Sequence, residues 1–122
     1  MTSRVIFVLV SHMALAMRIV QVVKEHHLNV RNFDKADRMV ESARLERPAF
    51  AILDYDDCEA EAFKVLKAFA SDAVLKTIPV VGFVSQSKVM VKTEAERAGC
   101  LRVYLKTDFM RSFDDLILRY VQ

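Results

Sequence analysis

The segment Ala49–Leu53 is a continuous apolar run that ends at a carboxylate, Asp54. A strand with one wet face would alternate apolar and polar side chains, so an unbroken run predicts a strand buried on both faces. Such strands belong to parallel sheets that are covered by helices on both sides. Residues that follow them lie at the carboxyl edge of the sheet, where open α/β sheets bind ligands. Asp54 is therefore the first candidate functional residue, alongside the simpler interpretation that it caps a loop or pairs with a lysine.

Strand-like and helix-like segments alternate along the whole chain. Apolar runs bounded by polar residues predict strands, and apolar residues at helical spacing predict amphipathic helices. A serine that directly follows the first strand, Ser11, is a natural helix N-cap, as is Asp34 before the second helix. The predicted strands are 5–10, 28–33, 49–53, 78–84 and 101–105, and the predicted helices are 12–26, 34–45, 59–70, 88–98 and 113–121.

This alternation predicts a parallel sheet with helices on both faces. The first, third and fourth strands are the most apolar, so we place them inside the sheet. The expected fold is a flavodoxin-like (βα)5 three-layer sandwich with strand order 2-1-3-4-5. With 122 residues and only two glycines and two prolines, the chain is expected to form a single domain, 1–122, without an internal linker.

Composition excludes several classes of function. The net charge is only +2, and basic residues are mixed with acids, so no nucleic-acid partner is expected. The longest apolar run, Val5–Val10, is too short to cross a bilayer, and no secretory signal is evident, so we expect a cytoplasmic protein with no membrane partner. Cys58 and Cys100 lack metal-ligand spacing and are expected to be reduced thiols.

Polar residues follow four of the predicted strands and should converge at the carboxyl edge of the sheet. These residues and the segments around them resemble the receiver domains of response regulators in two-component signalling, over essentially the whole chain. The resemblance is carried by ILDYD at 52–56, IPVVGFVS at 78–85, ERAGC at 96–100 and VYLKTDF at 103–109. It implies that Asp54 accepts a phosphoryl group from a histidine kinase and that Lys106 contacts that group.

The same resemblance locates the residues that change position when a receiver is phosphorylated. In receivers a Thr or Ser ends the fourth strand; the matching position here is Val84, and Ser85 follows one residue later. The aromatic switch position in the fifth strand falls on Val103. Tyr104 is next to it and points to the other face by strand alternation.

The sequence departs from receivers after the first strand. Receivers carry an acidic pair there that holds Mg²⁺, and this chain has Ser11 and His12. Mg²⁺ requires hard oxygen ligands, so Asp54 with a backbone carbonyl is a poor cage. Asp56 could help, but Asp56 and Asp57 are interpreted mainly as solvated charges or as a cap for the next helix.

We therefore expect no cofactor and no metal. The pocket would be closed by an Asp54–Lys106 pair, with the lysine lowering the pKa of Asp54. His12, if protonated, could add a second charge partner for Asp54. As a metal ligand, His12 is less plausible than as a helix-start residue.

Two functions remain open, and neither makes the chain an enzyme in its own right. The first is an atypical receiver that signals through protein–protein interaction, with phosphorylation of Asp54 absent or weak. The second is a working phosphoacceptor that needs Mg²⁺ and a histidine kinase as partner. A nucleotide-binding enzyme is disfavoured because no glycine loop follows the first strand.

The partners would be proteins, a kinase or a downstream effector. A homodimer could form through the fourth and fifth strand–helix units, with Leu101, Tyr104 and Phe109 contributing. Met13 and Met17 could lie on a docking surface, because methionine suits adaptable interfaces.

Overall fold

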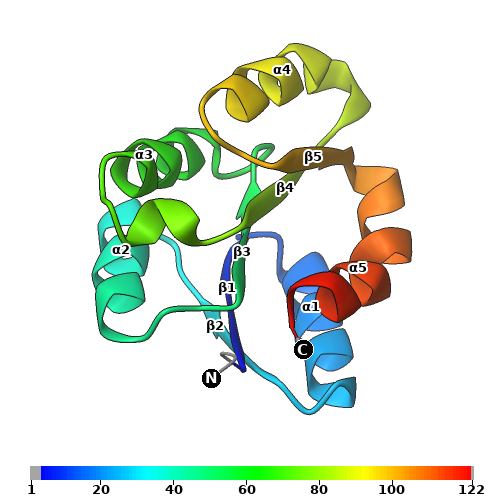
Figure 1. The fold of residues 1–122 in the computed structure, drawn as a ribbon. Coiled ribbons are helices and arrows are strands. Elements are labelled where there is room, and N and C mark those ends of the chain that lie inside the picture. Colours follow the sequence, from blue (N-terminus) through cyan, green and yellow to red (C-terminus); the bar gives the residue numbers. More distant parts are fainter. Residues whose placement is uncertain (1–3, 122) are drawn as a thin grey trace.

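Within residues 4–121, five parallel strands form one sheet at the centre of the molecule, and five α-helices cover it (Figure 1). A computed structural model describes residues 4–121. The strands are β1 Val5–Leu9, β2 Asn29–Asn32, β3 Phe50–Asp54, β4 Val80–Val84 and β5 Arg102–Leu105. The α-helices are α1 Met13–Glu25, α2 Ala36–Leu45, α3 Glu59–Ala70, α4 Val89–Arg97 and α5 Lys106–Tyr120. Two short 3-10 turns, η1 Leu75–Thr77 and η2 Gln86–Lys88, precede β4 and α4.

The predicted strand order is confirmed as β2-β1-β3-β4-β5. The three inner strands are buried along their whole length, which explains why their sequences do not alternate. In the register, Leu9 lies beside Leu53, and Asp54 lies beside Phe83. The carboxyl ends of β1, β3 and β4 therefore meet at one edge of the sheet.

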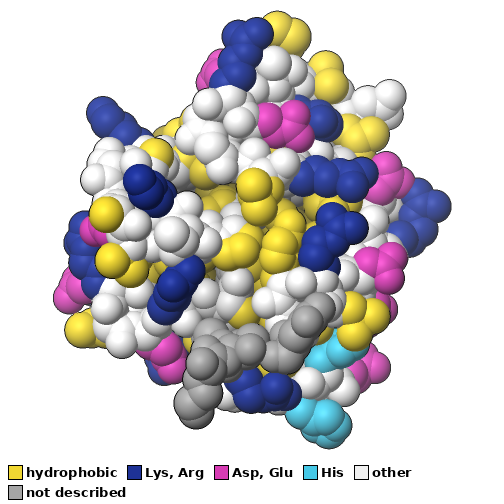
Figure 2. All heavy atoms as spheres, in the orientation of Figure 1, with side chains coloured by type: hydrophobic (Ala, Val, Ile, Leu, Met, Phe, Trp, Pro, Cys, Tyr) yellow, Lys and Arg dark blue, Asp and Glu magenta, His cyan; other side chains and the backbone are white. Residues whose placement is uncertain are grey.

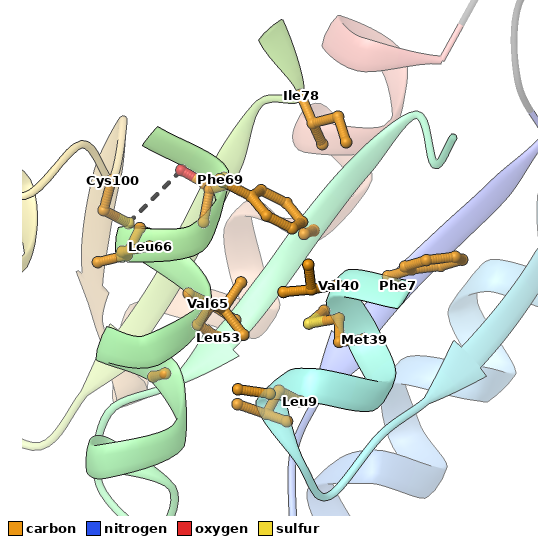
Figure 3. Close-up of a cluster of buried hydrophobic side chains, with 14 of the residues drawn as sticks. Phe7, Leu9, Met39, Val40, Leu53, Val65, Leu66, Phe69, Ile78 and Cys100 are labelled. Carbon is orange, nitrogen blue, oxygen red and sulfur yellow. Dashed lines mark hydrogen bonds between the residues drawn. The ribbon is translucent and has the colours of Figure 1, made fainter. Parts of the chain in front are cut away.

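One face of the sheet packs against α2, α3 and α4. Alternate strand residues such as Phe7, Leu9 and Leu53 point to this face and meet the apolar stripes of the helices. Figure 3 shows these side chains interdigitating, with Met39 and Val40 from α2 opposite the side chains of α3. The dashed line marks the Cys100 thiol, which donates to the carbonyl oxygen of Val80 at 3.5 Å.

The other face packs against α1 and α5 and is rich in aromatic residues. Phe83 of β4 lies 5.0 Å from Phe109 of α5, and Phe109 stacks on Phe113 at 5.5 Å, between ring centroids. Further along α5, Tyr120 lies 5.5 Å from Phe50. This row of rings fixes α5 against the sheet along most of its length.

Helix α5 begins seven residues earlier than predicted, at Lys106 rather than Phe113. The sequence pattern predicts no helix over residues 106–112, which carry mixed polar side chains. Its Phe109 nevertheless lies four residues before Phe113, so both fall on the buried stripe of one helix. Lys106 is therefore the first residue of a helix and not the end of a strand.

Two predicted helix caps are also replaced. The N-cap of α1 is His12 and not Ser11, and its Nδ1 accepts a hydrogen bond from the backbone N–H of Leu15 at 3.3 Å. The N-cap of α2 is Lys35 and not Asp34. The first backbone N–H of α2 donates instead to the carboxylate of Glu61, on the neighbouring helix α3.

Charged side chains are mixed over the surface. Figure 2 shows a hydrophobic area in the middle of one face, with Lys and Arg side chains scattered around it and acidic side chains among them. Within residues 4–121, no helix combines the length and the hydropathy that crossing a bilayer requires.

Candidate functional site

Asp54 ends β3 and is fully buried, with 0% of its surface exposed. Its Oδ1 accepts hydrogen bonds from the backbone N–H groups of Asp56 at 2.8 Å and Asp57 at 3.1 Å. Its Oδ2 is buried and has no hydrogen-bond partner among residues 4–121. Burial raises the pKa of Asp54 above its ordinary value, and the two backbone N–H groups offset that shift only in part.

Lys106 forms its ion pair with Asp56 and not with Asp54. Its Nζ lies 3.7 Å from Asp56 Oδ2, and the predicted Asp54–Lys106 pair is absent from the ion pairs of the described residues. Lys106 does lower the pKa of Asp54, as predicted, but the larger effect of burial, together with the nearby Asp57 carboxylate, leaves that pKa raised.

The choice of Asp56 has a physical reason. The side chains of Lys106 and Asp56 are 34% and 11% exposed, so both charges keep part of their hydration when they pair. Pairing with Asp54 would draw the ammonium toward a fully buried group. The free energy needed to desolvate an ion pair completely often exceeds the Coulombic gain of the pair. The rim of the pocket is therefore the favourable place for the lysine.

Asp56 joins three parts of the chain. Its Oδ1 accepts a hydrogen bond from the backbone N–H of Ser85 at 2.8 Å, and its Oδ2 faces Lys106. Its carbonyl oxygen accepts a hydrogen bond from Lys88 Nζ at 3.0 Å. The interpretation of Asp56 as a solvated charge or helix cap is thus wrong, whereas its neighbour Asp57 is exposed. Residues 55–57 form a turn, so strand alternation does not relate Asp56 to Asp54, and the sequence offers no signal for this role of Asp56.

Lys88 was not singled out from the sequence. Besides the Asp56 carbonyl, its Nζ contacts Glu59 Oε1 at 3.5 Å, at the start of α3. Nothing in the sequence around Lys88 separates it from other surface lysines. Its role follows from the folding of η2 over the loop after β3.

Ser11 and His12 are exposed at the end of β1. The ring of His12 caps α1, which confirms its interpretation as a helix-start residue. Ser11 lies beside Cys58, whose thiol has a pKa raised by burial and lowered in part by hydrogen bonding to Ser11. Neither residue supplies a carboxylate to the pocket.

The two candidate switch positions differ in environment. Val84 is fully buried in the apolar cluster under α3 and α4, so it has no polar group to offer the pocket. Ser85 follows at the pocket rim, where its N–H is bound to Asp56 and its Oγ lies 3.0 Å from Ser87 Oγ. Val103 and Tyr104 belong to the clusters on opposite faces of the sheet, as strand alternation predicts.

The suggested dimer residues are largely unavailable at the surface. Phe109 is completely buried, and Tyr104 is buried with its ring 4.5 Å from the guanidinium carbon of Arg102. Both therefore serve the core and not an interface, which corrects that part of the prediction. Leu101 is exposed, as are Met13 and Met17 on α1.

The residues of the pocket do not fit a Mg²⁺ ion. Residues 4–121 contain no group of three or more His, Cys, Asp or Glu side chains arranged to hold a metal. Asp54 Oδ1 is bound to two backbone N–H groups, and the Asp56 carbonyl is bound to Lys88. Mg²⁺ needs several hard oxygens in near-octahedral order, and of these Asp54 and Asp56 oxygens only Asp54 Oδ2 has no partner among the described residues.

Solved structures share the fold over almost the entire chain. The signal receiver domain of a response regulator from Bermanella marisrubri is 20% identical, with a TM-score of 0.82, covering 99% of this chain and 100% of that one. The receiver domain of a sensor histidine kinase from Pseudomonas aeruginosa, with a magnesium ion in its active-site cleft, is 12% identical, with a TM-score of 0.80 and 98% of both chains covered.

A chemotaxis response regulator of Vibrio cholerae is 15% identical, with a TM-score of 0.77, covering 99% of this chain and 100% of that one. No family model matches the sequence, and no curated protein does. The chain thus has the fold of receiver domains.

Proposed function

We propose that the chain is a receiver-like signal-transduction module that acts through protein–protein interaction, with Mg²⁺-dependent phosphorylation of Asp54 absent or weak. The fold and the positions of Asp54 and Lys106 support the receiver part of this proposal. The second part rests on the pocket, where the lysine neutralises Asp56 while Asp54 stays buried and bound to backbone.

The physical argument concerns charge. Transfer of a phosphoryl group to a carboxylate brings two anions together, so it depends on positive charge held at the site of transfer. The receiver domain from Pseudomonas aeruginosa contains a magnesium ion in its own active-site cleft. This chain has Ser11 and His12 after β1 in place of acids, and its Lys106 faces a different carboxylate. Both features leave Asp54 without the charge that transfer needs.

Access is the second obstacle. The free oxygen of Asp54, Oδ2, is buried, so a phosphodonor reaches it only if the loop around Asp56 moves. That loop is fixed by the Ser85 and Lys88 hydrogen bonds. A fixed loop suits a domain that presents one constant surface to its partner.

The test is incubation with acetyl phosphate in the presence and absence of Mg²⁺, followed by intact-mass measurement. The expected result is an unmodified chain in both samples. Asp54→Asn serves as the matched control, because it keeps the size of the side chain and removes the acceptor. A gain of one phosphoryl group that requires Mg²⁺ and disappears in Asp54→Asn would overturn the proposal.

One observation favours the alternative, a functional phosphoacceptor served by a histidine kinase. Asp54 Oδ2 has no hydrogen bond to any described residue, so its lone pairs are available once the pocket opens. In this alternative Mg²⁺ would supply the missing positive charge. Lys106 would have to leave Asp56 to contact the phosphoryl group.

A homodimer through the fourth and fifth units is part of the proposal as well. With Tyr104 and Phe109 in the core, its apolar contacts would come from Val89, Met90 and Leu101, which are exposed. Sedimentation equilibrium of the wild type against Leu101→Glu tests this. Dimerisation that the charge weakens supports it, and unchanged association contradicts it.

A further inference from the structure

We propose that Lys88 is the resident cation of this pocket, and that its ammonium excludes divalent cations by occupying the Asp56 carbonyl. This inference rests on the proposed function, because it explains why the pocket would work without Mg²⁺. Lys88 takes no part in the ion pair between Asp56 and Lys106.

The loop after β3 has an unusual concentration of acids. Asp54, Asp56, Asp57 and Glu59 fall within six residues, and Asp54 has a buried oxygen without a partner in the described chain. Like charges this close repel one another, so the loop requires compensating positive charge. Two lysine side chains from other elements supply it.

The two lysines bind different atoms. Lys106 approaches the Asp56 carboxylate, while Lys88 donates at 3.0 Å to the Asp56 carbonyl and lies 3.5 Å from Glu59 Oε1. Carbonyl and carboxylate oxygens are the ligands that hard divalent cations select. An ammonium group seeks the same oxygens, so Lys88 and a divalent cation compete for one place.

The lysine has an advantage in that competition because it belongs to the chain. Its local concentration at the carbonyl is set by the short connection through η2, Gln86–Lys88, and not by the concentration in solution. The same lysine links the β4–α4 connection to the start of α3. A chelator could remove a metal ion, but it could not remove the ammonium group of Lys88.

Lys92 provides a matched control in the next turn of the chain. It lies on α4, its side chain is 37% exposed against 40% for Lys88, and it also pairs with a carboxylate, that of Glu96. Its pair lies between residues of α4 itself, and it does not bind Asp56. Removing either lysine changes the net charge equally, but only Lys88→Met frees the Asp56 carbonyl.

The experiment is a titration with Mn²⁺ as a paramagnetic probe, read from the amide NMR signals, with no phosphodonor present. In Lys88→Met we expect saturable broadening at the amides of Asp56 and Asp57, with half-saturation at least tenfold below any effect in the wild type. Lys92→Met should behave as the wild type does. Lys88→Arg, which keeps the charge, should also resist Mn²⁺.

Three results would overturn the proposal. They are equal Mn²⁺ response in Lys88→Met and wild type, an equal gain in Lys92→Met, or a gain in Lys88→Arg as large as that in Lys88→Met. If Lys88→Met does not fold, Lys88→Gln takes its place. Failure of the proposed function is seen separately, as Mg²⁺-dependent phosphorylation of the wild type by acetyl phosphate.

Discussion

The partner of Lys106 can be identified by a double-mutant cycle. Asp56→Asn keeps an oxygen for the Ser85 N–H and removes the charge that faces Lys106, while Lys106→Met removes the ammonium. Because both groups are partly exposed, their coupling free energy should be about 0.5–1 kcal/mol. The coupling between Asp54→Asn and Lys106→Met should be smaller, below about 0.3 kcal/mol, because no ion pair joins them.

A larger truncation tests the other contact of Asp56. Asp56→Ala also removes the acceptor of the Ser85 N–H, a hydrogen bond to a charged group worth about 1.5–3 kcal/mol. With the ion pair added, the loss of unfolding free energy should reach about 2–4 kcal/mol. Asp56→Asn should therefore cost much less than Asp56→Ala.

Urea unfolding followed by far-UV circular dichroism measures all the variants. The cycle should be repeated at high salt, where the Asp56–Lys106 coupling should fall because the pair is partly exposed. The reasoning would be refuted if Lys106 coupled more strongly to Asp54 than to Asp56. Equal losses for Asp56→Asn and Asp56→Ala would refute the role of the Ser85 contact.

Three further outcomes are expected. Because burial raises the pKa of Asp54 above 3.8, its ionisation destabilises the folded state as the pH rises from 3.8 through the raised pKa. This loss of unfolding free energy should be absent in Asp54→Asn. Identical pH profiles of unfolding free energy for the two proteins would contradict it. Gly82→Ala should cost about 1–3 kcal/mol, because the added Cβ would overlap the Tyr55 ring, and unchanged urea midpoints would contradict this. Iodoacetamide at neutral pH should modify Cys58 slowly and Cys100 only after unfolding, since burial raises the pKa of Cys100 to about 11. Equal rates of modification of the two cysteines in the folded protein, measured by mass spectrometry, would contradict it.

The fold could be predicted from the sequence because its strongest signals are local. Continuous apolar runs at 5–10, 49–53 and 78–84 mark strands buried on both faces, and only inner strands of a covered sheet are buried in that way. The start of α5 was missed for the opposite reason. Between Lys106 and Phe113 only Phe109 is fully buried, and its partner Phe83 is distant in sequence.

The site could be predicted only as far as the ends of the strands. The sequence places Asp54 and Lys106 at one edge of the sheet, but it does not say how far each side chain is buried. Burial decides the partner of Lys106, because Asp54 is fully buried and Asp56 is at the rim within reach of the ammonium. Lys88 could not be found for a related reason, since its partner is a backbone carbonyl, which every residue carries.

The early start of α5 has a mechanical consequence. Since Lys106 is the first residue of a 15-residue helix, no slack chain separates its side chain from the helix body. A helix of that length is about 22 Å long and bends little. Any event that moves the Lys106 backbone would therefore act on the whole helix, against the aromatic contacts that hold it to the sheet. Its far end, where Tyr120 meets Phe50, would register a change made at the opposite edge of the sheet.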